Sequence, residues 1–337
     1  MSGDPMITLP GTSLSVSRLC LGGNRLGAQL DHAASFALLD AFTDCGGNFI
    51  DTAHVYADWL PDVERSCSEK TIGRWLAARG AAGRVVVATK IGHPPLDNPM
   101  LRRLDAASLR RDIEEALANL GLPRLDLVYL HRDDPGRPVD EILGSLEEFR
   151  QAGLIRYYGA SNWSALRLAQ AQETAQRQGW QGFSANQPEW SLAMRNPGSA
   201  PGDLVEMSPG MLEWHIRHQV AVIPYSAQAK GYFDKVLAGA LDEGARRAYD
   251  NRTNRARAEA LHEIASRLNA TPTQVALNML ARGPVPTIPV VGPRNAEQIK
   301  SSFDSLSIDL TDQDIARFWN QRLWSDDSRG QAQPEDR

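Results

Sequence analysis

Cysteines and long apolar stretches are both scarce in this sequence, and each absence excludes a class of protein. Three of the 337 residues are cysteines (Cys20, Cys45 and Cys67), an odd number whose spacing fits no metal site. A reduced compartment is the simplest interpretation, so we expect a cytoplasmic protein without a bound metal. No run of about 18 apolar residues is present, so no membrane span is expected. Residues 1–14 have neither the basic nor the apolar region of a signal peptide.

An excess of positive charge is absent as well. The 36 lysines and arginines are outnumbered by 41 aspartates and glutamates, which gives a net charge of −5. Because an acidic protein repels the phosphate backbone, we expect no non-specific binding to nucleic acid. The length suits either two or three domains or one large α/β barrel. A small molecule is the expected partner, and no oligomeric state is predicted.

Short apolar runs rich in β-forming residues recur along the chain, each followed by a stretch with helical periodicity. The expected strands are Leu19–Gly22, Asn48–Thr52, Val85–Lys90, Asp126–His131, Ile155–Ala160, Phe183–Gln187, Ala221–Tyr225 and Thr287–Val291. Most start-to-start spacings are roughly 30–40 residues, the size of one βα unit. Eight such units favour a closed (β/α)8 TIM barrel, although periodicity alone leaves an open, doubly wound sheet possible.

Helices are expected between the strands, and several segments lie outside the repeat. The expected helices are Ala33–Asp44, Ser68–Arg79, Ala107–Leu120, Asp140–Gln151, Ala165–Gln178, Met211–Arg217 and Arg257–Leu268, with Ser161 or Asn162 as the cap of the helix after Trp163. We expect an N-terminal β-hairpin (Met6–Leu9 with Ser13–Val16) under the barrel and an extra C-terminal helix from Thr311 through Trp319. The barrel would span residues 1–324, followed by a disordered tail over 325–337. Ser191–Met207 and Ser226–Arg252 are candidate lids.

Four chemically distinctive residues fall where three of the expected strands end. Asp51 and Tyr56 follow the second strand, Lys90 ends the third and His131 ends the fourth. In a barrel, the carboxyl ends of the strands share one rim and carry the chemistry. We therefore expect these four side chains to converge.

The types of residue in this set suit carbonyl reduction. A buried lysine needs a counter-charge, and Asp51 is the nearest carboxylate. A lysine beside Tyr56 would lower the pKa of the phenol from about 10 toward neutrality, which prepares it to protonate a carbonyl oxygen. His131 would orient the carbonyl or complete a proton relay. None of these groups supplies electrons, so a hydride must come from a cofactor.

Together with other motifs, these residues resemble the aldo-keto reductase family from Gly11 to about Trp319. The matching stretches are Gly11-Thr-Ser-Leu-Ser-Val-Ser17, Phe49-Ile-Asp-Thr-Ala-His-Val-Tyr56, Ala88-Thr-Lys90, Asp126-Leu-Val-Tyr-Leu-His131, Tyr158-Gly-Ala-Ser-Asn162, Asn186-Gln187, Pro224-Tyr-Ser226 and Gly292-Pro-Arg294. The resemblance implies that Asp51, Tyr56, Lys90 and His131 form the catalytic tetrad, with Tyr56 as general acid. It also implies a nicotinamide cofactor bound on the barrel itself, in keeping with the lack of a G-x-G-x-x-G motif after any strand.

The resemblance extends to the cofactor-binding residues. It implies contacts from Gly23, Asn24, Asp51, Ser161, Asn162, Gln187, Tyr225, Ser226, Ala227, Gln228, Gly292, Arg294 and Gln298. Tyr225 would stack on the nicotinamide, and Arg294 would bind the adenosine 2′-phosphate, which favours NADP(H) over NAD(H). Ser226-Ala-Gln228 stands where the family usually has Ser-Pro-Leu. Pro293 and Ser302 are further departures from its pattern.

Three tryptophans follow the rim motifs and suggest the shape of the substrate site. Trp59, Trp163 and Trp190 would form an aromatic bowl above the nicotinamide, alongside Asn24, Tyr56 and His131. With polar neighbours such as Arg25, Asp58 and His93, the bowl favours a sugar, glycoside or cyclitol carbonyl, and a hydrophobic aldehyde is the alternative. Strand alternation points His54 away from Tyr56, so His54 is interpreted as a packing residue.

Two other functions fit the same fold. A glycoside hydrolase would need paired carboxylates, and Asp51 has no evident partner at the rim. A redox-sensing module would bind the nicotinamide but turn over little substrate. The complete tetrad favours an oxidoreductase that interconverts a carbonyl and an alcohol.

Overall fold

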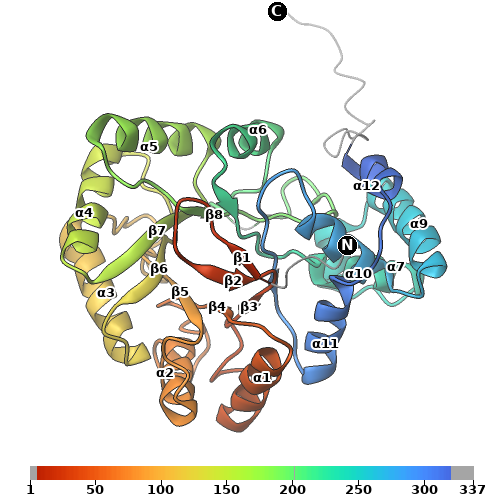
Figure 1. The fold of residues 1–337 in the computed structure, drawn as a ribbon, viewed down its shortest axis with the longest axis horizontal. Helices are drawn as coiled ribbons and strands as arrows, with labels where there is room; N and C mark the ends of the chain where they lie inside the picture. Colours follow the sequence, from red (N-terminus) through yellow and green to blue (C-terminus); the bar gives the residue numbers. More distant parts are fainter. Residues whose placement is uncertain (1–5, 201, 320–337) are drawn as a thin grey trace, which may run out of the picture.

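Eight parallel strands form the central sheet of the computed structural model, which describes residues 6–200 and 202–319 (Figure 1). They lie in the order β10-β3-β4-β5-β6-β7-β8-β9. Their bounds are β3 (Cys20–Gly22), β4 (Phe49–Asp51), β5 (Val86–Ile91), β6 (Leu125–Leu130), β7 (Ile155–Ser161), β8 (Ala185–Gln187), β9 (Ala221–Val222) and β10 (Val290–Val291). Each strand from β3 to β9 therefore pairs with the next one in the chain, as a barrel requires.

The sheet closes on itself between its two end strands. Val222 in β9 donates its N–H to the carbonyl of Pro286 at 2.8 Å and accepts a hydrogen bond from the N–H of Ile288 at 2.9 Å. The N–H of Val290 in β10 donates to the carbonyl of Pro224 at 2.9 Å. These bonds exclude an open, doubly wound sheet, and the predicted (β/α)8 barrel is confirmed.

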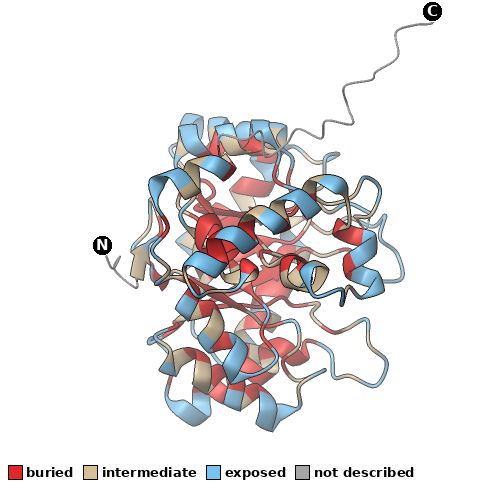
Figure 2. Cartoon of the chain, turned by 90° about the vertical axis from the view of Figure 1, so that its right-hand side faces the viewer, coloured by how far each residue is buried: buried red, intermediate tan, exposed pale blue. Residues whose placement is uncertain are grey.

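Helices surround the barrel, with their outer faces exposed and their inner faces buried against the strands (Figure 2). The first six strands of the barrel are followed by α1 (His32–Asp44), α2 (Cys67–Arg79), α3 (Ala106–Leu120), α4 (Val139–Gln151), α5 (Ala165–Gln178) and α6 (Pro209–His218). Five of these helices agree with the prediction to within one residue at each end. The predicted cap of α5 is wrong, because Ser164 rather than Ser161 or Asn162 accepts a hydrogen bond from the N–H of Arg167. Ser161 and Asn162 are thereby left for other contacts.

The region after β9 contains more helix than the sequence indicated. It comprises η1 (Ala229–Gly231), α7 (Tyr232–Leu237), α8 (Glu243–Tyr249), α9 (Arg252–Arg267) and α10 (Pro272–Ala281), and β10 is followed by α11 (Ala296–Ser305) and the predicted extra helix α12 (Asp312–Trp319). The helices α7, α8, α10 and α11 were not predicted. The capping box at Thr271 and Gln274 gives α10 a recognisable start in the sequence.

The two candidate lids are fastened to each other and to α9. The N–H of Asn196 donates to the carbonyl of Ala248 at 2.7 Å, and Asn254 Nδ2 donates to the carbonyl of Met194 at 2.7 Å. The first segment is therefore anchored by the second one. Closure of either segment over a substrate stays a prediction.

An N-terminal hairpin lies under the barrel, as predicted. Its strands β1 (Met6–Thr8) and β2 (Ser15–Ser17) pair in antiparallel fashion. Leu9, Leu14 and Val16 are buried in one cluster with the inward-facing residues of the barrel floor. The N–H of Ser17 donates to Asn48 Oδ1 at 2.7 Å, just before the start of β4. The hairpin thus covers the amino ends of the strands and leaves the carboxyl ends for a site.

Two further predictions concern a membrane span and the end of the chain. No helix within residues 6–200 and 202–319 is long and apolar enough to cross a membrane. The predicted disordered tail, residues 325–337, lies outside the described residues.

Candidate active site

The four predicted catalytic residues converge at the carboxyl ends of three adjacent strands. Asp51 is the last residue of β4, Lys90 lies in β5 and His131 directly follows β6. Tyr56 lies in the turn after β4, and all four line one cavity. The barrel register explains this convergence, because β4 pairs with β5 and β5 pairs with β6.

Lys90 is the centre of this group. Its Nζ donates to Asp51 Oδ2 at 2.6 Å, to Tyr56 Oη at 2.8 Å and to the carbonyl of Thr52 at 3.0 Å. An ammonium group has three donors, so all three of its N–H bonds are used. The Lys90 and Asp51 side chains are each only 2% exposed. Asp51 Oδ1 accepts a further hydrogen bond from Gln187 Nε2 at 2.9 Å, which ties β8 into the network.

The protonation state of Tyr56 differs from the prediction. Burial raises the pKa of Tyr56 well above its ordinary value, and the negative charge of Asp51 adds to the shift. The hydroxyl also donates to Asp51 Oδ2 at 3.3 Å, a contact that favours the neutral phenol. The expected pKa near neutrality is therefore wrong for the protein alone. Tyr56 therefore keeps its proton in the protein alone, and its oxygen accepts a hydrogen bond from Lys90 Nζ at 2.8 Å.

His131 is held in its neutral form. Burial lowers the pKa of His131 well below its ordinary value, and the charges of Arg132 and Lys90 lower it further. Its ring lies 6.0 Å from that of Tyr56 and 4.7 Å from that of His93, centroid to centroid. A neutral imidazole beside the phenol can orient a carbonyl by hydrogen bonding, but it does not supply a charge.

The cavity extends well beyond the tetrad and has a volume of about 880 Å³. Twelve of the thirteen residues predicted to bind the cofactor line it: Asn24, Asp51, Ser161, Asn162, Gln187, Tyr225, Ser226, Ala227, Gln228, Gly292, Arg294 and Gln298. Gly23 does not line it. Its N–H donates to the carbonyl of Asp51 at 2.7 Å, and a Cβ at this position would lie 2.9 Å from the same oxygen. Gly23 therefore allows β3 and β4 to approach closely, and Gly22 faces the cavity instead.

Polar side chains from β7 and the loops after β8 and β9 form a rigid shelf beside the tetrad. Ser161 Oγ donates to the carbonyl of Gln187 at 2.8 Å, and Asn162 Nδ2 donates to Ser161 Oγ at 3.1 Å. Asn162 Oδ1 accepts hydrogen bonds from the hydroxyl of Tyr225 at 2.9 Å and from the N–H of Val205 at 3.1 Å. The ring of Tyr225 is held in place by this shelf.

The cavity lining also contains several cations. Arg25, Lys230 and Arg294 have no side-chain ion pair within the described residues, whereas Lys235 is paired with Asp242 and Asp234 is a further acidic residue of the lining. Thr273 Oγ1 is buried there without a hydrogen-bond partner in the described part of the chain. Such a set of donors suits the phosphates of a dinucleotide. A cavity of about 880 Å³ that contains both the amide shelf and these cations fits a nicotinamide dinucleotide.

Several residues of this lining were not predicted: Arg132, Leu204, Lys230, Asp234, Lys235, Asp242, Thr271, Thr273, Gln274 and Ser301. The position of Arg132 directly after His131 was a signal that it lies at the rim. The Thr271–Gln274 capping box could have indicated a helix start. The others belong to helices and loops that the periodicity did not reveal.

The predicted aromatic bowl does not form. The Trp163 ring is fully buried and packs against Phe183, and Trp190 is 4% exposed and packs against Trp319. Neither of these tryptophans lines the cavity. Trp59 is 50% exposed, and its ring lies 6.3 Å from that of Tyr56. Trp59 does not line the cavity either, but it is the one of the three tryptophans that is exposed beside Tyr56.

The chain was compared with known families and proteins. A model of the Aldo/keto reductase family matches residues 18–320. The uncharacterized oxidoreductase YrpG of Bacillus subtilis (strain 168) is 31% identical over 316 residues, which cover 92% of this chain and 93% of the relative. Norsolorinic acid reductase stcV of Emericella nidulans is 29% identical over 91% of this chain and 78% of its own. An aryl-alcohol dehydrogenase of Phanerodontia chrysosporium, named for NADP(+), is 28% identical over 90% and 81%, respectively.

The buried contact between Lys90 and Asp51 leads to a first prediction, which concerns stability. Asp51→Asn should lower the free energy of unfolding by about 3–5 kcal/mol, because it leaves a buried ammonium without a counter-charge. Lys90→Met should have a similar cost. The double variant should cost less than the sum of the two, because it leaves neither charge alone. Urea denaturation followed by circular dichroism measures all three.

The exposed pair of Lys300 and Asp304 on α11 is the control, with side chains that are 71% and 52% exposed. Lys300→Met should leave the denaturation midpoint unchanged. Strictly additive effects of Asp51→Asn and Lys90→Met would contradict the predicted coupling.

Proposed function

The chain belongs to the aldo/keto reductase family and is a carbonyl oxidoreductase, and we propose that it uses Tyr56 as its general acid and base. One observation carries this proposal. Lys90 Nζ contacts both Tyr56 Oη and Asp51 Oδ2, and the Lys90 and Asp51 side chains are each only 2% exposed. This contact gives the phenol a cationic neighbour on the protein side and leaves its other side to the cavity.

The chemistry supplied by a bound nicotinamide is hydride transfer to the carbonyl carbon. Tyr56 Oη would donate its proton to the carbonyl oxygen as negative charge develops there. Lys90 Nζ would stabilise the phenolate that remains, and Asp51 would hold Lys90 in place. Neutral His131 would orient the carbonyl oxygen toward Tyr56. In the direction of alcohol oxidation, the same phenolate would accept the proton.

The role of Tyr56 leads to a second prediction. Tyr56→Phe should lower kcat for carbonyl reduction by about 10²–10⁴-fold, the usual contribution of a positioned general acid. Binding of NADPH, measured by quenching of protein fluorescence, should be preserved, because the hydroxyl is the only group removed. The assay follows nicotinamide absorbance with a panel of aldehydes and ketones.

The redox-sensing alternative makes the opposite prediction for the wild type. A module of that kind would bind NADPH tightly and turn over no carbonyl in the panel. Turnover that persists in Tyr56→Phe would show that another group donates the proton.

We propose NADP(H) as the preferred cofactor. Support comes from the cations Arg25 and Lys230 in the cavity lining, and above all from Arg294. Its guanidinium has no hydrogen bond within the described residues, while its backbone N–H donates to Gln298 Oε1 at 2.8 Å. A planar guanidinium fixed through its backbone but free at its side chain suits the two oxygens of a 2′-phosphate.

A third prediction tests this preference. Arg294→Ala should raise KM for NADPH by about 10–100-fold, the loss of charge-assisted hydrogen bonds worth about 1.5–3 kcal/mol. KM for NADH should barely change, because NADH lacks the 2′-phosphate. Lys300→Ala, on the neighbouring α11, should change neither value. An equal loss for both cofactors would contradict a role in binding the 2′-phosphate.

We further propose that the substrate is an aromatic carbonyl compound or the matching aryl alcohol. The sugar interpretation rested on three tryptophan walls, of which only Trp59 is exposed beside Tyr56. Three more exposed apolar side chains, Leu96, Met100 and Leu101, lie on the loop after β5 that also carries His93, together with the exposed polar residues Asp97 and Asn98. Exposed apolar side chains of this kind favour a hydrophobic ring over a polyol. The names of the fungal relatives support the same class.

A fourth prediction follows for Trp59. Trp59→Ala should raise KM for 2-naphthaldehyde by about 2–10-fold, the size of an aromatic contact worth about 0.5–1.5 kcal/mol. KM for propanal should stay the same, because propanal has no ring. Ile216→Ala, an exposed apolar position on α6, should affect neither substrate. More efficient turnover of xylose than of the aromatic aldehydes would overturn the proposed class but leave the role of Tyr56 intact.

A further inference from the structure

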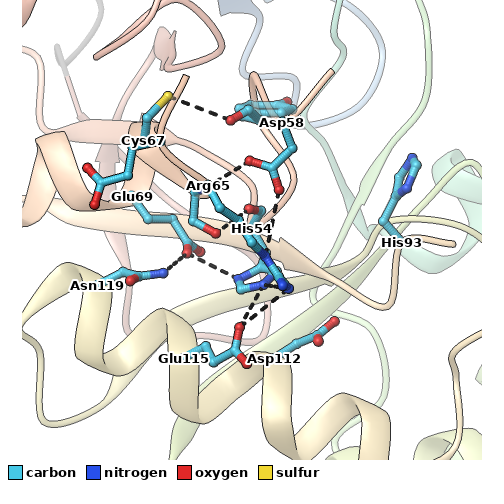
Figure 3. A network of polar contacts seen from close by, with 12 residues as sticks. His54, Asp58, Arg65, Cys67, Glu69, His93, Asp112, Glu115 and Asn119 are labelled. Atoms are coloured by element: carbon cyan, nitrogen blue, oxygen red, sulfur yellow. Dashed lines mark hydrogen bonds and ion pairs between the residues drawn. The ribbon is translucent and has the colours of Figure 1, made fainter. Parts of the chain in front are cut away.

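The turn that carries Tyr56 is fastened on its far side by a polar network that the proposed mechanism does not use (Figure 3). The N–H of His54 donates to the carbonyl of Lys90 at 3.0 Å, and Ser66 Oγ donates to the carbonyl of His54 at 2.7 Å. The N–H of Ser66 donates to Asp58 Oδ1 at 2.8 Å. His54 thus joins the catalytic turn to the strand that carries the catalytic lysine.

This segment needs fastening, because its backbone is strained. Ala57, Asp62 and Ser66 all have positive φ angles, of 69°, 63° and 56°. Residues other than glycine adopt this region at a cost of order 1 kcal/mol or more each. Tyr56 is the residue directly before the first of these positions. Contacts on both sides of the turn are therefore required to keep the phenol in place.

The His54 side chain points away from Tyr56, as predicted, but its surroundings are ionic rather than apolar. Its Nδ1 lies 3.4 Å from Oε2 of Glu69, an ion-pair contact rather than a hydrogen bond. Its Nε2 lies 3.1 Å from Oε2 of Glu115. Arg65 Nη2 also forms a hydrogen bond with Nε2 at 3.1 Å, which an unprotonated Nε2 accepts. When Nε2 is protonated it faces Glu115 instead, and the Arg65 side chain, which is 66% exposed, keeps its ion-pair contacts with Glu115 at 3.6 Å and Asp58 at 3.9 Å.

Glu69 is the buried carboxylate that His54 neutralises. This carboxylate is fully buried, and it accepts hydrogen bonds from Thr89 Oγ1 at 2.6 Å and from Asn119 Nδ2 at 2.9 Å. Both of these donors are neutral. Among the described residues, His54 is the one titratable base in ion-pair contact with Glu69. A buried carboxylate without a counter-charge is strongly unfavourable, so the ionised Glu69 favours a protonated His54.

Carboxylates on two neighbouring helices act on the pKa of His54 in the same direction. Burial lowers the pKa of His54, but contact with Glu69 on α2 and the charges of Asp112 and Glu115 on α3 outweigh it, and the pKa is raised above 6.5. His215 provides the contrast within the same chain. It is also buried but faces no carboxylate, and burial lowers the pKa of His215 to about 4.

We propose that His54 and Glu69 form a positioning pair, in which protonated His54 holds the turn so that Tyr56 Oη stays within reach of Lys90 Nζ. This inference rests on the proposed role of Tyr56. When His54 loses its proton, Glu69 becomes an uncompensated buried charge, and the turn between His54 and Ser66 loosens. Loss of the pair should lower the rate of proton transfer and leave cofactor binding intact. The reason is that the residues of this ionic network do not line the cavity: His54, Glu69, Glu115 and Arg65.

The sign of the pH dependence follows from the raised pKa. His54 is fully protonated below its unfolded pKa of about 6.5, and its contribution is lost as the pH rises through the higher value in the folded protein. The kcat for reduction should therefore fall on the alkaline side of neutrality. KM for the cofactor should stay constant over the same range. Tyr56 itself does not cause such a fall, since its pKa is raised far above this window.

A fifth prediction tests the pair with three variants. At pH 6, His54→Gln should lower kcat by about tenfold to a hundredfold, the usual cost of a misplaced catalytic group, and kcat should then no longer vary through the window in which the wild type declines. Glu69→Gln should move the alkaline fall of kcat to lower pH, because His54 loses its nearest counter-charge. His32→Gln is the control. This exposed histidine at the start of α1 contacts Thr71 and Arg74 on α2, the helix that carries Glu69, and its loss should leave the wild-type profile unchanged.

The outcomes separate this inference from the proposed function. Thermal unfolding followed by circular dichroism establishes the folded fraction, and kcat is expressed per folded enzyme. An unchanged kcat and an unchanged alkaline fall in folded His54→Gln would overturn the positioning pair, even if Tyr56→Phe abolishes turnover. A loss of stability without any change in kcat would overturn it as well. Full activity of Tyr56→Phe would instead overturn the proposed mechanism on which the inference rests.

Discussion

The contact between Lys90 and Asp51 is the constraint on which the rest of the site depends. A buried ammonium must have its three donors satisfied, and here the acceptors are a carboxylate, a phenol and a backbone carbonyl. Each acceptor comes from β4 or the turn that follows it, while Lys90 comes from β5. The position of Tyr56 is thus fixed by the need to bury Lys90. Gln187, which donates to Asp51 from across the barrel, extends the same requirement to β8.

This constraint is met because the barrel is closed at one end and open at the other. The hairpin of β1 and β2 fills the amino ends of the strands, and the bonds between β9 and β10 complete the ring. The tetrad and the amide shelf at the carboxyl ends then face a single cavity. The amide shelf of Ser161 and Asn162, on one side of the tetrad, and Arg294, on the other, are brought together by strand order alone. The helices cover the outside of the barrel, and α2 and α3 also supply the carboxylates Glu69 and Glu115 that contact His54.

The sequence was sufficient to predict what depends on strand order. The eight strands and the convergence of Asp51, Lys90 and His131 follow from the positions of strand ends, and the resemblance to the family indicated twelve cofactor-binding residues that line the cavity. Features that depend on packing were missed or predicted wrongly. Trp163 and Trp190 lie beside rim motifs in the chain, yet both rings turn into the core to pack on Phe183 and Trp319. The pKa of Tyr56 was predicted from its lysine neighbour alone, whereas burial and Asp51 raise it.

Histidines show why residue type and burial together do not determine a charge. His131 and His54 are 7% and 5% exposed, and they lie on opposite sides of the same catalytic turn. His131 is surrounded by Arg132 and Lys90, so burial and these cations keep it neutral. His54 is surrounded by carboxylates on α2 and α3, so it favours the protonated form in spite of its burial. Neutral His131 is therefore the polar, uncharged neighbour of the Tyr56 phenol on the side of the substrate, and His54 acts on the backbone of the turn. The charges of His54 and Glu69, which fix the turn that carries Tyr56, lie outside the cavity and so do not contact the substrate.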